Sequence, residues 1–219
     1  MKYRLENIDL GDLEDVVIKL EDSFGIQLTG IDLLKINNFG ELTDIIKEQI
    51  EFKNEESCTS QQAFYKLKKI IEKEFGIENL NPKSELSEIF PKRERLLRIK
   101  QIEKKLDFKL KITQPKSILL KIFGYLFITS LLLFIFNYKI AFMVFIASII
   151  GIWTLHKFGK ELSINTFGEL AEKMKRENYS KVRRNKNSIN KNEIEKIIID
   201  TFSIELDIEK SELGRNALI

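Results

Sequence analysis

Few side chains in this 219-residue chain are of the types that carry out catalysis, and they lie far apart. Cys58 stands just before Thr59 at the expected start of a helix, where a helix N-terminus can activate a thiol. A lone Cys without a paired His indicates an unreactive thiol in a reducing compartment. His156 has no second His or Cys near it. We therefore interpret it as an interfacial side chain and not as a metal ligand.

The sequence motifs of common active sites are also missing. The chain has no Gly-rich phosphate loop, no nucleophile elbow, no zinc-ligand spacing and no HExxH. Among its 33 Asp and Glu, no two stand out as an acid/base pair. One Cys, ten Gly and three Pro exclude disulfide-stapled and collagen-like proteins. We predict a protein that is not an enzyme and that uses no cofactor and no metal.

The most informative feature is a long segment without carboxylates. Residues 117–155 contain two Lys and no Asp or Glu, in a chain of which 32% is charged. The segment holds two apolar runs, 118–136 and 140–155, separated by Asn137, Tyr138 and Lys139. Runs of 16–19 residues approach the ~30 Å of a bilayer core at ~1.5 Å per residue. The sequence predicts an antiparallel transmembrane helical hairpin, with a buried hairpin in a soluble protein as the alternative.

Charge is distributed unevenly around this hairpin. Residues 1–57 carry 6 basic and 14 acidic side chains, whereas residues 92–116 carry ten Lys and Arg. The positive-inside rule then places both termini in the cytoplasm. Five basic residues are our candidates for contacts with lipid headgroups or an acidic partner: Arg93, Arg95, Arg98, Lys104 and Lys105. Four acidic residues are our candidates for docking a basic protein partner: Asp9, Asp12, Glu14 and Asp15.

A second basic segment, 173–191, has a composition that nucleic-acid-binding proteins also show. It follows an apolar run closely, however, and each Lys or Arg near an anionic leaflet gains roughly 1 kcal/mol. We therefore predict a lipid bilayer and a protein as partners, and no nucleic acid.

Outside the hairpin the sequence predicts short amphipathic helices and an all-α fold. Leu13, Val16, Val17, Leu20 and Phe24 share one helical face that ends at Gly25. Asn38 is placed to cap a following helix. Thr59 and Gln62 have the spacing of a capping box at the start of another helix, which ends at Gly76.

Two sequence matches indicate an internal repeat. INNFGEL at 36–42 recurs as INTFGEL at 164–170, an offset of 128 residues. FGIENLNPKSEL at 75–86 recurs as FSIELDIEKSEL at 202–213, an offset of 127 residues. Two matches at nearly one spacing argue for duplication.

These helices resemble the acyl carrier protein fold in short stretches. LEDSFGIQL at 20–28 resembles the end of the family's second helix, and NFGELTDII at 38–46 resembles the opening of the fourth. Residues 61–90 resemble the first helix and its loop, residues 95–110 a second helix, and NTFGELAEKM at 165–174 a fourth. CTSQQAFYKL and the overall plan also resemble a group of uncharacterised bacterial membrane proteins. The resemblance implies a multi-pass protein of the bacterial inner (cytoplasmic) membrane.

The chain departs from carriers at the residue that defines their function. A carrier bears its phosphopantetheine arm on a Ser, but the corresponding positions are Leu10 and Lys92, and residues 1–22 contain no Ser or Thr. We expect a non-enzymatic membrane-anchored scaffold or docking protein with degenerate carrier-like modules on the cytoplasmic face. The alternatives are a functional acyl or peptidyl carrier or accessory of lipid-metabolising enzymes, and a regulatory or immunity-type membrane protein.

The expected domains follow from these assignments. They are an acidic carrier-like module at 1–52, basic carrier-like helices at 59–116, the transmembrane hairpin at 117–156, a returning helix at 157–178, a basic linker at 179–191 and a C-terminal helix at 192–219. The two ends of the chain have two possible arrangements. Either 192–219 closes on 9–50, burying Ile194, Ile197 and Ile198, or the C-terminal helix docks elsewhere or stays loose.

Overall fold

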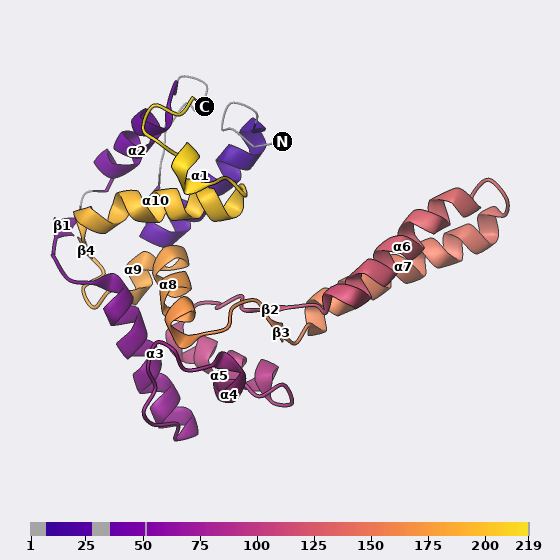
Figure 1. Cartoon of the computed structure of the whole chain (residues 1–219), viewed down its shortest axis with the longest axis horizontal. Coiled ribbons are helices and arrows are strands. Elements are labelled where there is room, and N and C mark those ends of the chain that lie inside the picture. Colours follow the sequence, from indigo (N-terminus) through magenta and orange to yellow (C-terminus); the bar gives the residue numbers. More distant parts are fainter. Residues whose placement is uncertain (1–7, 28–35, 51, 219) are drawn as a thin grey trace. The chain divides into compact units, whose positions relative to one another are not determined.

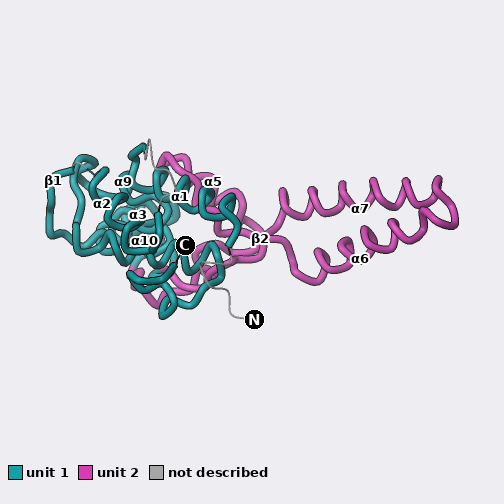
Figure 2. Tube along the Cα trace, turned by 90° about the horizontal axis from the view of Figure 1, so that it is seen from above, with its two compact units in different colours: residues 1–78, 168–219 teal, residues 79–167 magenta. Residues whose placement is uncertain are grey.

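The computed structural model describes residues 8–27, 36–50 and 52–218, and 64% of the chain is helical. This confirms the prediction of a mainly α-helical protein. The chain divides into two compact units (Figure 2): unit 1 comprises residues 1–78 and 168–219, and unit 2 comprises residues 79–167. Each unit is described separately below.

Unit 1 is built on three helices that share a hydrophobic core (Figure 1). They are α1 (Leu10–Phe24), α2 (Phe39–Glu48) and α10 (Lys191–Glu205). The apolar face predicted for 13–24 lies in this core, and α1 ends as expected at Gly25, whose φ of 69° favours glycine. The ring of Phe39 on α2 meets Phe202 on α10 edge to face, with 5.1 Å between ring centroids.

The C-terminal helix α10 packs on α1 and α2, which resolves the two arrangements left open by the sequence. Ile194, Ile197 and Ile198 are each at most 1% exposed and belong to the same core as Val16 and Leu20. The short 3-10 helix η3 (Lys210–Glu212) follows, and the amide of Phe39 donates to the carbonyl of Ala217 at 2.9 Å. The ends of the chain therefore complete one core between them.

Polar side chains fix where α2 begins. The side chain of Asn38 accepts a hydrogen bond from the amide of Glu41 at 2.9 Å, as predicted for a helix cap. The carboxylate of Glu41 in turn accepts from the amide of Asn37 at 2.9 Å, and this bond lowers the pKa of Glu41. Two backbone amides at the start of the helix are thus satisfied by neighbouring side chains.

The rest of unit 1 consists of α3 (Thr59–Phe75), α8 (Phe167–Glu177, from residue 168) and α9 (Tyr179–Val182). A parallel pair of two-residue strands joins the segment before α3 to the segment after α9. These strands are β1 (Lys53–Asn54) and β4 (Ser188–Ile189). The predicted capping box at Thr59 is wrong. Cys58 occupies the cap position without a side-chain bond, and the Thr59 amide donates instead to Glu193 of α10 at 3.0 Å.

A buried arginine connects these elements. The side chain of Arg183 is fully buried and donates to the hydroxyls of Thr59 at 2.8 Å, Ser57 at 3.0 Å and Ser188 at 3.1 Å. It also donates to the phenol oxygen of Tyr179, which accepts from the amide of Asn190 at 2.8 Å. Burial raises the pKa of Tyr179. These bonds hold the start of α3 and the segment before α10 to α9.

Unit 2 contains the short helix α4 (Leu86–Ile89), α5 (Arg95–Leu106) and a helical hairpin of α6 (Ser117–Leu133) and α7 (Tyr138–Phe158). The two ends of the hairpin are joined by an antiparallel pair, β2 (Thr113–Gln114) and β3 (Glu161–Leu162). At this junction Gly159 lies against the backbone of Gln114. A Cβ on Gly159 would stand 2.6 Å from the Gln114 carbonyl carbon.

Replacing Asn38 with Ala should remove the cap of α2. The amide of Glu41 would lose its partner, and we expect a loss of about 1 kcal/mol in the stability of unit 1. Equilibrium unfolding of the full chain followed by the helical circular-dichroism signal measures this loss. The control is Asn192→Ala, which replaces an exposed side chain of α10. If the Asn38→Ala protein is as stable as this control, the assigned cap is contradicted.

Replacing Arg183 with Met should loosen the first turn of α3, because several buried hydroxyls and carbonyls would lose their donor. We expect a local loss of about 3 kcal/mol. Hydrogen exchange at the amides of α3 should then accelerate about a hundredfold, provided that exchange follows local opening. The neighbouring exposed residue supplies the control, since Arg184→Met leaves the buried bonds in place and should not change exchange in α3.

Candidate functional site

The acidic residues predicted to dock a partner all lie at the surface of α1. Asp12, Glu14 and Asp15 are exposed in the first half of the helix, and Asp9 is its N-terminal cap, with an oxygen 3.5 Å from the amide of Gly11. Carboxylates at this end also stabilise the helix through its dipole. The four side chains form an accessible acidic surface, and part of their charge serves the helix itself.

The basic residues predicted for headgroup contact are divided by the fold. Arg93 is exposed before α5, and Lys104 and Lys105 are exposed in its last turn. Arg98 is partly buried, where it pairs with Glu94 at 2.8 Å and donates to the carbonyl of Ile89 at 3.0 Å.

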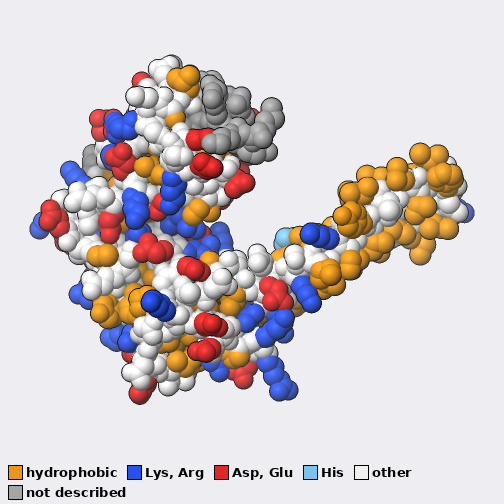
Figure 3. Space-filling model, in the orientation of Figure 1, with side chains coloured by type: hydrophobic (Ala, Val, Ile, Leu, Met, Phe, Trp, Pro, Cys, Tyr) orange, Lys and Arg blue, Asp and Glu red, His pale blue; other side chains and the backbone are white. Residues whose placement is uncertain are grey.

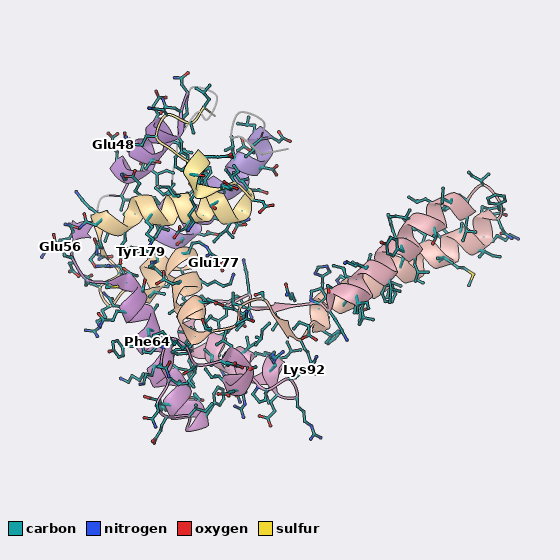
Figure 4. All side chains as sticks on the ribbon, viewed as in Figure 1. Glu48, Glu56, Phe64, Lys92, Glu177 and Tyr179 are labelled. Atoms are coloured by element: carbon teal, nitrogen blue, oxygen red, sulfur yellow. The ribbon has the colours of Figure 1, made fainter. Side chains whose placement is uncertain are left out.

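The expectation for Arg95 requires a correction. Arg95 is 6% exposed and donates to the carbonyl of Phe90 at 2.8 Å and to the carbonyl of Lys160. Its guanidinium group therefore links α5 to the segment after the hairpin and is not exposed for contact with a headgroup. Nearby, Lys92 pairs with Glu161 at 2.6 Å, and this hydrogen bond lowers the pKa of Glu161 (Figure 4 labels Lys92). The sequence of this basic segment does not distinguish cations that face inward from those that face outward.

The hairpin of α6 and α7 exposes its apolar side chains. Figure 3 shows hydrophobic side chains along its whole length. The large apolar residues that are more than half exposed there are Ile118, Tyr125, Ile128, Leu132, Ile135, Phe136, Tyr138, Ile140, Phe142, Met143, Ile150, Trp153 and Phe158. An apolar surface of this extent is rare on a soluble monomer and marks a surface that another apolar phase or molecule covers.

The residues inside the hairpin are small or hydroxylated. Ser130 on α6 and Ala141 and Ser148 on α7 are the buried positions of these helices. The hydroxyl of Ser130 donates to the carbonyl of Phe127 at 2.6 Å, and that of Ser148 donates to the carbonyl of Phe145 at 2.7 Å. Each hydroxyl is therefore satisfied within its own helix. Polar groups inside and apolar groups outside are the arrangement expected in lipid.

The lengths of the two helices correct the predicted localisation. Within the described ranges, α7 is the one helix long and apolar enough to cross a membrane, with 21 residues and a mean hydropathy of 1.9. The helix α6 ends at Leu133, because residues 134–137 form the reversal, and its 17 residues reach roughly 26 Å. The prediction of a multi-pass protein of the bacterial inner membrane with both termini in the cytoplasm is therefore wrong.

A groove in unit 1 gathers cations that the sequence does not place together. Lys66 and Lys69 of α3 line it together with Lys181, Arg184 and Lys186, which follow more than a hundred residues later. The groove encloses about 410 Å³. The sequence treats the basic segment 173–191 as one surface near an anionic leaflet, but its residues differ in burial. Lys175 is buried against Ser60, whereas Arg184 and Lys186 are exposed.

The two residues considered first for chemistry lie near the ends of two different helices. Cys58 is exposed at the start of α3, and His156 is exposed in the last turn of α7. In the part of the chain that the structure describes, no group of three His, Cys, Asp or Glu side chains is placed to hold a metal ion. The arrangement offers an apolar hairpin, an acidic helix surface and a basic groove, which are surfaces suited to binding.

Comparison of the chain with protein-family models, with characterised proteins and with solved structures finds no match.

Proposed function

We propose that this chain is a non-enzymatic docking protein that is anchored to a lipid membrane by its apolar hairpin. The observation that carries the proposal is the inverted arrangement of α6 and α7, in which many large apolar side chains are exposed whereas Ser130 and Ser148 are buried. Only 11% of the most apolar stretch of α7 is buried. A core helix of a soluble domain is buried instead, so the hairpin needs an apolar environment outside this chain.

The ends of the hairpin support its role as an anchor. Lys157 lies over the ring of Trp153, 4.7 Å from its centroid, and Lys116 precedes the first helical residue of α6. Aromatic and basic side chains of this kind favour the headgroup region of a bilayer. Because β2 pairs with β3, the two ends of the hairpin are held next to each other.

The helical part supplies the docking surfaces in this proposal. The carboxylates of α1 suit a basic protein partner, and Arg93, Lys104 and Lys105 suit anionic lipid or an acidic partner. The carrier-like character of the modules belongs to the same proposal. Its support is the packing of α10 on α1 and α2, which supplies the helix that the N-terminal segment lacks relative to a carrier.

A functional carrier is a weaker alternative, because the position of its attachment serine is occupied by Leu10 or Lys92. Ser84 does not replace it, since its hydroxyl accepts a hydrogen bond from the amide of Asn81 within a turn. We therefore expect the intact mass of protein isolated from its native host to lack a phosphopantetheine group.

A charge in the middle of the hairpin should release the protein from membranes. Ile149 on α7 is 45% exposed, and Ile18 on α1 is similarly exposed at 52%. Placing a carboxylate in bilayer hydrocarbon costs about 3 kcal/mol, so Ile149→Glu should reduce vesicle affinity about a hundredfold. Ile18→Glu is the matched control and should bind as the unmodified chain does.

Flotation of the purified chain with phosphatidylcholine vesicles measures this binding. Equal flotation of the Ile149→Glu and Ile18→Glu proteins would contradict the anchor. So would a chain that stays in the aqueous phase as a discrete oligomer in the presence of vesicles, because a second copy would then cover the hairpin.

Charge reversal should separate the basic surface from the anchor. The triple variant Arg93→Glu, Lys104→Glu, Lys105→Glu should lose affinity for vesicles containing phosphatidylserine and keep its affinity for phosphatidylcholine vesicles. The difference should shrink as salt is raised, because exposed charges are screened. If the variant and the unmodified chain show the same salt dependence on anionic vesicles, these residues do not contact headgroups.

A further inference from the structure

The basic groove of unit 1 has properties that a merely solvated row of lysines lacks. Its two walls come from α3 and from the end of α9 with the residues that follow it, and both belong to the same compact unit. The cationic side chains of its lining are Lys66, Lys69, Lys181, Arg184 and Lys186, and the described lining residues include no Asp or Glu. A volume of about 410 Å³ falls within the range of small-ligand sites.

Hydrogen bonds hold both walls of the groove in place. The ammonium group of Lys66 donates to the carbonyl of Lys181 at 2.7 Å, and the amide of Arg184 donates to the side chain of Gln62 at 2.8 Å. The buried bonds of Arg183 fix the residues between them. The groove is therefore preorganised, which lowers the entropic cost of binding.

The cations are held close enough to disfavour one another. Burial lowers the pKa of Lys66, and the charge of Lys186 lowers it further. Lys66 uses one N–H for Lys181 and keeps two for a ligand. An anion in the groove would relieve this repulsion and accept these remaining hydrogen bonds.

The shape of the groove selects among anions. Tyr65, 51% exposed, is the aromatic residue of the lining and provides a phenol hydroxyl at the rim. Single-stranded nucleic acid is instead bound along extended grooves with successive aromatic platforms. A compact anion of high charge fits the converging lysines better, and phosphate oxygens are acceptors that Lys and Arg commonly bind.

We propose that this groove binds a compact, multiply charged phosphate group, carried either by a free polyphosphate or by a lipid headgroup that ends in a phosphate monoester. This site is separate from the apolar hairpin. Its proposal does not rest on membrane anchoring, so a failed flotation experiment leaves it unaffected.

The test is calorimetric titration of inorganic pyrophosphate into the full chain, kept in solution by a neutral detergent at physiological salt. We expect saturable binding that weakens at least tenfold in the double variant Lys66→Ala, Lys186→Ala. Lys196→Ala removes an exposed lysine of the same unit that does not line the groove, and it should change the affinity less than twofold. The double variant Lys69→Ala, Arg184→Ala provides a second measurement in case Lys66 is needed for folding.

A second arm identifies the source of the phosphate. Nanodiscs that contain phosphatidate should compete with pyrophosphate if a headgroup occupies the groove, and this competition should disappear in the Lys66→Ala, Lys186→Ala protein. Saturable pyrophosphate binding without such competition assigns the site to a free polyphosphate.

Three results would overturn the proposal. The first is the absence of saturable binding for both pyrophosphate and phosphatidate. The second is equal weakening by Lys196→Ala, which would show a general effect of net charge. The third is binding of single-stranded RNA that strengthens with its length and exceeds that of pyrophosphate, which would assign the basic residues to nucleic acid.

Discussion

The guanidinium group of Arg183 is a full positive charge placed out of contact with water, and unit 1 is organised around satisfying it. Burying an unpaired charge is prohibitively costly, so its N–H groups must all find acceptors. They do so on hydroxyls and carbonyls of residues 55–59 and on Ser188, and the ring of Tyr179 lies 5.6 Å away. The carboxylate of Glu55 lies 3.8 Å from this guanidinium group.

Several other features depend on this arrangement. The first turn of α3 lacks a cap of its own and receives one from Glu193, which also accepts from the hydroxyl of Tyr179. The parallel pair of β1 and β4 lies beside the same bonds. The same bonds set the geometry of the groove between α3 and residues 181–186, because Arg183 lies between Lys181 and Arg184 in the chain. A polar network thus sets the positions of surface charges.

The hairpin exposes the kind of side chain that unit 1 buries. In unit 1, Ile194, Ile197 and Ile198 of α10 face the core, whereas α6 and α7 turn many of their large apolar side chains outward. The side-chain hydroxyls inside the hairpin bond to carbonyls three residues earlier and so need no water. Both arrangements occur in one chain because the carboxylate-free residues form one continuous segment. The pairing of β2 with β3 joins the two ends of this segment.

Local sequence determined those features whose causes are local. The helical faces, the left-handed stops at Gly25 and Gly76, the cap at Asn38 and the apolar reversal near Asn137 each depend on residues within a few positions. Only the tertiary structure decided which charged side chains are exposed and so available to bind a partner or ligand. Arg95 and Arg183 look like their exposed neighbours in the sequence, yet long-range carbonyls and hydroxyls bury them, and Lys66 reaches Lys181 across 115 residues. Hydrogen-bond partners distant in the chain carry no periodic signal, because their pairing is set by packing and not by spacing.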